Sequence, residues 1–243
     1  MSAYRTSAAG RSGRRRRPLR SLLILIIVLL GLLVAADFAA KTVAQDVLAS
    51  QLKSHGFAVK PSVSIQGFPF LTQLARRQFA QINLSSRDVP EGPVTVKTIN
   101  AALTGVNLYP DYKGATVRQL TGSAFISFPA VSSALQSAAG PLGALVGSSG
   151  LTLSAVGPDQ IRATVNLVIT SGSATWRLTQ LNGRELQFQL ISSSGLPSAV
   201  LSSVADIKVP LPALPFNVTI SNVAVAPDGI VGQLAGSNLS FGS

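Results

Sequence analysis

The stretch "GPVTVKTINAALTGVNLYPD", Gly92 to Asp111, decides the fold. Its apolar residues are even-numbered, then odd-numbered, then even-numbered again: Val94 and Val96; Ile99, Ala101 and Leu103; Val106 and Leu108. Successive side chains of a strand point to opposite faces, so each change of parity predicts a β-bulge or a sharp bend. A run of about 15 residues within it would extend roughly 50 Å, and long bulged strands of this kind occur in strongly curved sheets.

The same period of two continues on the C-terminal side. Val117 to Phe128 changes parity at Leu120, and alternation is cleanest over residues 161–169. Asn182-Gly183 predicts a hairpin, and Pro227-Asp228-Gly229 predicts the last turn. The strand before that turn changes parity at Ser221-Asn222.

Helical spacing interrupts the strands at three places. Asp37 to His55 carries apolar residues at helical intervals, with cations in its last turn and Gly56 as the stop. A short helix is predicted in "FLTQLARRQ" (70–78), and a further helical stretch in residues 129–147 is broken at Gly140-Pro141, with Leu142–Val146 as an extra turn. The order predicts an α+β fold in which a long, strongly curved antiparallel sheet wraps a long helix.

The basic charge lies mostly in a short tail. Residues 1–20 hold seven arginines and no acid, whereas the rest of the chain has 13 basic and 9 acidic side chains, a balance of +4. The main body thus offers no basic stripe, and we expect no nucleic-acid partner. The chain has no cysteine, which excludes disulfides, thiolate catalysis and cysteine-ligated zinc.

An apolar segment follows the tail. Residues 22–36 contain no polar side chain, and a basic run before an apolar run predicts export. The segment is either a retained anchor, which we favour, or a signal peptide cleaved before Asp37 or after Ala44. We expect a cytoplasmic tail (1–20), a transmembrane anchor or signal segment (21–40) and an extracytoplasmic domain (41–243). The location is then the cell membrane, with a single pass and a periplasmic domain, or the secreted fraction if the signal is removed.

Residues suited to catalysis are sparse. The single histidine, His55, lies at a predicted helix end, and the acids of the body stand singly, with Asp88 and Glu91 in a turn-like segment. We therefore expect neither an enzyme nor a metal site, and no cofactor. The bulky side chains predicted to point inward either complete the core or line a lipid cavity: Phe125, Phe128, Trp176, Phe188 and Phe216.

Two segments, "ADFAAKTVAQDVLASQL" (36–52) and "PSVSIQGFPFLTQLARRQFAQINLSSRDV" (61–89), resemble the start of the LmeA family of actinobacterial envelope proteins that bind phospholipid. "GFPFLTQ" (67–73) carries most of the similarity. The resemblance implies a tubular lipid-binding (BPI-like) fold with an apolar groove. It also implies a phospholipid partner of the phosphatidylinositol type, the membrane as a second partner, and a role in lipomannan assembly. The long apolar anchor is a departure from the family pattern, because a retained anchor would prevent the protein from shuttling freely as a carrier.

The region around "GFPF" has two interpretations. It is either a corner that closes the end of the sheet or a lip at the entrance of a lipid groove. In the lip, acyl chains would meet Phe68, Phe70, Leu74 and Phe79, and lipid phosphates would meet Arg76 and Arg77.

Three functions are compatible with the sequence. The first is a non-catalytic protein that carries or presents phospholipid in cell-envelope assembly. The second is an envelope scaffold that docks a membrane partner through an apolar face, and the third is a hydrolase that uses a serine and His55.

Overall fold

The computed structural model describes residues 17–54, 57–92, 94–138, 150–166, 171–181, 185–196, 205–210, 214 and 217–242. The helices are α1 (Arg17–Ser54), α2 (Phe70–Arg76) and α3 (Phe128–Ala138). The strands are β1 (Ser62–Ile65), β2 (Gln78–Glu91), β3 (Val94–Leu108), β4 (Ala115–Ser127), β5 (Leu151–Gly157), β6 (Gln160–Asn166), β7 (Ser171–Leu181), β8 (Glu185–Ser194), β9 (Asp206–Pro210), β10 (Thr219–Ala226) and β11 (Gly229–Phe241). The predicted α+β class with antiparallel strands is confirmed.

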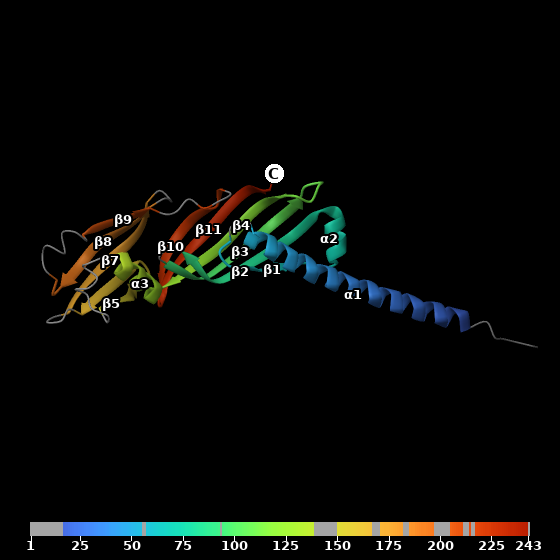
Figure 1. Ribbon diagram of the computed structural model, residues 1–243, viewed down its shortest axis with the longest axis horizontal. Helices are drawn as coiled ribbons and strands as arrows, with labels where there is room; N and C mark the ends of the chain where they lie inside the picture. The colour runs from blue at the N-terminus through green and yellow to red at the C-terminus, as the bar shows by residue number, and fades with distance from the viewer. Residues whose placement is uncertain are drawn as a thin grey trace, which may run out of the picture.

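Helix α1 joins the apolar segment to the folded body without a break. Its 38 residues include both the expected anchor and the helix predicted from Asp37, so the boundary expected at residue 40 falls inside one helix. Lys53 lies in the last turn, as predicted, whereas His55 and Gly56 lie outside the described residues. The N-terminal part of α1 projects away from the body as a stalk (Figure 1).

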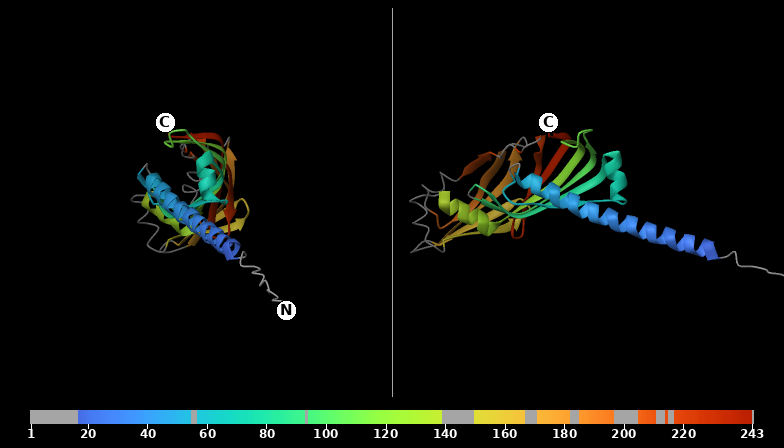
Figure 2. Two further views of the ribbon diagram at one scale, coloured as in Figure 1. Left: turned by 90° about the vertical axis from the view of Figure 1, so that its right-hand side faces the viewer. Right: turned by 45° about the vertical axis from the view of Figure 1, so that its right-hand side comes forward.

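The strands form two sheets. The first has the order β1-β2-β3-β4-β11-β10 and the second the order β5-β6-β7-β8-β9. All of these pairs are antiparallel, and the sheets lie end to end along the molecule (Figures 1 and 2). The single long sheet of the sequence interpretation is therefore divided, because β5–β9 pair with one another before β10 and β11 return to the first sheet. Over the residues that the structure describes, neither sheet closes on itself.

The predicted parity changes occur in the first sheet. The β2–β3 pairing passes from Phe79–Val106 to Gln81–Thr104 without a shift in register, and Gly105 between them has a φ of 62°. The change is thus a local backbone turn rather than a bulge. At the parity change near Ser221, by contrast, the β10–β11 register does shift, between Ile220 and Asn222. The sequence predicted both positions.

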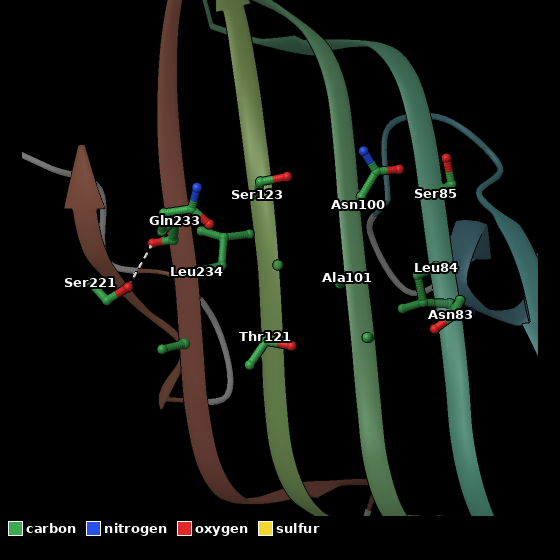
Figure 3. A pocket seen from close by; sticks show the side chains of 13 residues that line it. Asn83, Leu84, Ser85, Asn100, Ala101, Thr121, Ser123, Ser221, Gln233 and Leu234 are labelled. Atoms are coloured by element: carbon green, nitrogen blue, oxygen red, sulfur yellow. Dashed lines mark hydrogen bonds between the residues drawn. The ribbon is translucent and has the colours of Figure 1, made fainter. Parts of the chain in front are cut away.

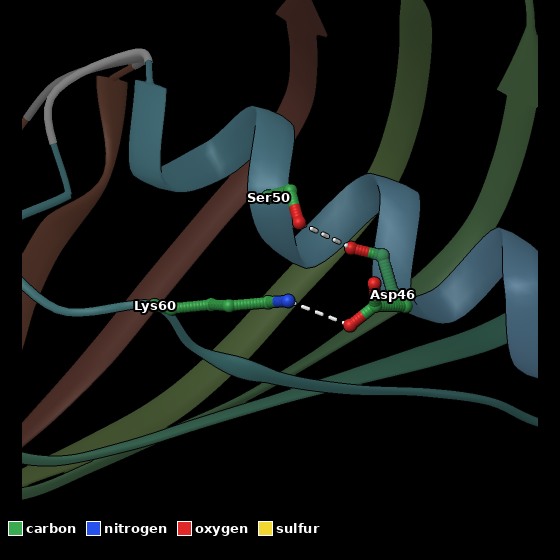
Figure 4. A network of polar contacts seen from close by, with 3 residues as sticks. All are labelled: Asp46, Ser50 and Lys60. Carbon is green, nitrogen blue, oxygen red and sulfur yellow. Dashed lines mark hydrogen bonds and ion pairs between the residues drawn. The ribbon is translucent and has the colours of Figure 1, made fainter.

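The C-terminal half of α1 packs on one face of the first sheet. Ala49 and the partly buried Ala40, Ala44, Leu48 and Leu52 cover a core built from β1, α2, β2, β3, β4 and β11. The Gln45 amide oxygen accepts a hydrogen bond from the Ile65 N–H at 3.0 Å, which occupies a free donor on the edge strand β1. Figure 4 shows a second link, in which Lys60 Nζ donates to Asp46 Oδ1 at 2.6 Å. Helix α1 is therefore a structural element of the domain.

The two sheets are joined through the turn between β5 and β6. The Val225 N–H of β10 donates to the Pro158 carbonyl at 3.0 Å, and the Leu178 N–H of β7 donates to the Asp159 carbonyl at 2.7 Å. Helix α3 contacts β5, β3 and β4 and lies on the same side of the sheets as α1 (Figures 1 and 2). The extra helical turn predicted over Leu142–Val146 and the Asn182-Gly183 turn lie outside the described residues, although β7 and β8 pair as that hairpin requires.

Candidate lipid-binding surfaces

The "GFPF" region divides into buried and exposed parts. Phe70 is 1% exposed and Phe79 is 5% exposed, and their ring centroids lie 6.0 Å apart in the core. Leu74 is half-buried against the same core. Phe70 and Phe79 therefore pack as the corner interpretation predicts. Their contact with acyl chains stays a prediction.

A buried carboxylate holds this corner against α1. Asp37 is 3% exposed, and its two oxygens accept hydrogen bonds from the N–H groups of Phe70 (2.8 Å) and Leu71 (2.7 Å). These are the first N–H groups of α2, which have no partner inside the helix. Asp37 therefore caps α2 from a distant part of the chain. The sequence interpretation missed this role, although an acid directly after a long apolar run was a signal that it has a partner.

The exposed part of the corner is apolar. Phe68 is 60% exposed and Leu71 is 37% exposed. The Phe68 ring stacks on Phe38 of α1, with centroids 6.1 Å apart, and Phe38 is itself 57% exposed. We call Phe38, Phe68 and Leu71 the apolar lip. It continues the exposed apolar surface of α1 onto the domain.

Cations lie at the other end of α2. Arg76 is in its last turn and exposed, and Arg77 caps the helix in the left-handed conformation with a φ of 56°. The Arg77 carbonyl accepts a hydrogen bond from the Leu108 N–H at 2.9 Å, which fixes this end of α2 beside the end of β3. Among the described residues, neither arginine has a carboxylate within ion-pair distance. Both charges can therefore serve an external anion.

An apolar surface continues along the first sheet beyond α1. Strand pairing places Ile99, Ala124 and Gly232 in one row across β3, β4 and β11, and Val223 of β10 extends it. This row lies on the same face as the core residue Leu120, two rows away, and its members are half-buried. A Cβ placed on Gly232 would meet only Ile220 Cγ2, at 3.7 Å, so the described residues leave space above it. We call the row Ile99, Ala124, Gly232 and Val223 the apolar strip.

The second sheet has a comparable face. Ile161, Trp176 and Leu190 pair across β6, β7 and β8, and Phe188 lies on the same face one row away. Ile161 is buried, whereas Trp176 and Phe188 are half-buried. These two predicted residues therefore share a partly covered apolar surface.

The remaining predicted aromatic residues lie elsewhere. Phe128 is 4% exposed at the start of α3. Phe125 pairs with Thr98 and Val231, and by strand alternation it points to the face opposite Ala124. Phe216 lies outside the described residues. The structure does not gather the predicted aromatic side chains into one cluster.

An open hollow of about 700 Å³ lies against β2, β3, β4, β10 and β11 of the first sheet (Figure 3). Its lining comes mainly from three adjacent rows of the sheet and mixes the polar residues Asn83, Ser85, Asn100, Thr121, Ser123, Ser221 and Gln233 with Gly122 and the apolar residues Leu84, Ala101, Ala102, Leu234 and Ala235. Leu84, Ala101 and Leu234 also pack against the core. Their row lies between the apolar strip and the row of Leu120, so the hollow adjoins the apolar strip.

The structure thus has half-buried apolar faces on two antiparallel sheets and, at the α2 end of the first sheet, an exposed apolar corner beside two arginines. The model of the LmeA-like phospholipid-binding family matches residues 35–235, so the chain belongs to that family. The family resemblance predicted from the sequence is confirmed. No curated protein and no solved structure matches the chain. The family match begins two residues before Asp37, where α1 first makes contact with the domain.

Proposed function

We propose that the protein is a non-catalytic, extracytoplasmic phospholipid-binding protein that presents lipid from a membrane anchor during cell-envelope assembly. Membership of a phospholipid-binding family supports lipid binding. The observation that carries the location of the lipid is the space above Gly232 in the apolar strip. Acyl chains laid on this strip would gain about 0.8 kcal/mol for each buried methylene group.

The shape of the lipid site, the type of lipid and the process it serves follow from the family resemblance. The two sheets would together form a groove of the tubular lipid-binding type, with the strip and the face around Trp176 as its floor. Phosphatidylinositol-type lipids, and a role in making lipomannan or related glycolipids, are the proposed cargo and process. Arg76 and Arg77 would favour an anionic phosphate through charge-assisted hydrogen bonds.

The packing of α1 argues against cleavage after Ala44. Cleavage after Ala44 would remove Asp37 and Ala40, and would leave the Phe70 and Leu71 N–H groups without their acceptor. Cleavage before Asp37 would keep the cap but remove the apolar stretch. The described part of the chain contains one helix that is long and apolar enough to cross a membrane, and it belongs to α1; a signal sequence passes the same test. The mass of the mature protein distinguishes these forms.

Blocking the strip tests the lipid site. Gly232→Trp would fill the space above the strip, whereas Gln233→Trp would place the same side chain on the opposite face. We expect phospholipid recovered with the purified full-length protein, measured by mass spectrometry, to fall at least several-fold in Gly232→Trp and to stay unchanged in Gln233→Trp. Circular dichroism checks that both variants are folded. Equal lipid recovery from the two variants would refute this site.

A further inference from the structure

We infer that the end of the domain that carries α2 is seated in the outer leaflet of the bilayer, with the apolar lip among the lipids. The inference rests on the proposed anchoring of α1. It adds a second membrane contact, made by the folded domain itself. The occupant of the lip is thus the lipid surface that also surrounds α1.

The length of the apolar stretch is the first argument. Residues 22–36 of α1 are all exposed, and fifteen residues of α-helix rise only ~22 Å. The hydrocarbon core of a bilayer is ~30 Å thick and needs ~20 residues. If the hydrocarbon core begins at Leu22, residues 37–41 of α1 therefore lie at the level of the outer leaflet, which is where the domain begins.

The burial of Asp37 is the second argument. A carboxylate at this depth is costly unless it is paired or shielded. The N–H groups of Phe70 and Leu71 satisfy both of its oxygens, and the residue is 3% exposed. Leu71 and its neighbour Phe68 then present apolar surface on the outside of the cap. At the level of Asp37 on α1, the carboxylate is therefore buried, while the side chains of Phe68 and Leu71 are exposed.

The end of the domain that carries α2 has residues that are common at membrane interfaces. The turn between β3 and β4 lies at the same end as α2, because Leu108 bonds to Arg77 (Figures 1 and 2). The turn carries Tyr112, which is 55% exposed, between the exposed Asp111 and Lys113. An aromatic hydroxyl and cations beside an apolar patch are typical of the bilayer interface, where rings sit at the headgroup level and cations meet phosphates.

Site-directed labelling of the full-length chain tests this placement, since the absence of cysteine allows single labels. Phe68→Cys and Leu71→Cys report the lip. Val156→Cys and Ile191→Cys are controls in the second sheet, at side chains that are 47% and 45% exposed. Ile26→Cys reports whether α1 is embedded. Each bimane-labelled variant is reconstituted in phosphatidylcholine–phosphatidylglycerol vesicles that contain nitroxide-labelled lipids, and its quenching is measured.

We expect strong quenching at positions 26, 68 and 71, and at least threefold weaker quenching at positions 156 and 191. Quenching at position 26 with lip labels that behave like the two controls would overturn the inference and leave the anchor intact. An unquenched label at position 26 would overturn both the anchor and the inference. Lipid recovery from the same unlabelled protein reports phospholipid binding separately, so a failure of that function is distinguishable.

Discussion

Replacing Asp37 by alanine should detach α2 from α1. The substitution removes two hydrogen bonds, at 2.8 and 2.7 Å, from a carboxylate that is 3% exposed. Hydrogen bonds to charged groups contribute about 1.5–3 kcal/mol each. The lower value applies here, because Leu71 is 37% exposed and water can reach its N–H after local opening. The expected loss of stability is therefore about 3 kcal/mol.

Asp46 provides a matched control on the same helix. Its carboxylate also accepts a short hydrogen bond, from Lys60, but its side chain is 73% exposed. Exposed ion pairs of this kind contribute about 0–1 kcal/mol, so Asp46→Ala should be nearly neutral. Asp37→Asn keeps one acceptor oxygen and should lose about half as much stability as Asp37→Ala.

Hydrogen exchange of the full-length protein in nanodiscs measures the effect where it arises. A loss of about 3 kcal/mol corresponds to roughly 100-fold faster exchange of the α2 amides, provided that they exchange by local opening. The second sheet serves as an internal reference, and its exchange should not change. The reasoning fails if Asp37→Ala and Asp46→Ala give the same exchange in α2 and the same unfolding midpoint in urea.

Three further changes test other parts of the structure. In urea unfolding, Gly105→Ala should destabilise the domain by about 1–2 kcal/mol more than Gly92→Ala. Both glycines have a positive φ, but their surroundings differ: a Cβ at Gly105 would lie 2.9 Å from Arg118 Cβ, whereas a Cβ at Gly92 would meet nothing within 4 Å. Brominated phospholipid should quench the fluorescence of Trp176, the single tryptophan, and unchanged emission would exclude acyl chains from the second sheet. Arg76→Gln should lower the preference for anionic over zwitterionic vesicles several-fold in flotation at low salt, whereas Arg87→Gln on β2 should not.

Local sequence patterns predicted the parts of the fold that depend on local geometry. The parity changes at Gly105 and Ser221 are visible in the sequence, because an alternating strand shows any exchange of faces directly. The turn at Pro227-Asp228-Gly229 was predicted from its turn-forming residues, and the pairing of Ala226 with Gly229 confirms it. The short helix over residues 70–76 follows from a change of period.

Pairing between distant segments could not be predicted in this way. The division into two sheets depends on whether β10 and β11 pair with β4 or with β9, and both choices satisfy the same alternation. The cap on α2 joins residues 33 and 34 positions apart, and no local rule relates them. The same limit applies to the candidate site. "GFPF" was correctly singled out as a corner, but only the folded chain shows that Phe70 is buried and Phe68 is exposed.

The packing of α1 also bears on how a lipid would be handled. A flexible tether lets a domain leave the membrane, whereas a helix that continues into the core fixes the height and the direction of the domain. Residues of one α1 face, from Ala40 to Leu52, are part of the core, so the domain cannot detach from the helix without losing stability. If α1 is retained in the membrane, as we propose, a lipid on the apolar strip would stay with the anchored domain. Presentation of phospholipid to a neighbouring acceptor would then be favoured over its transport through free solution.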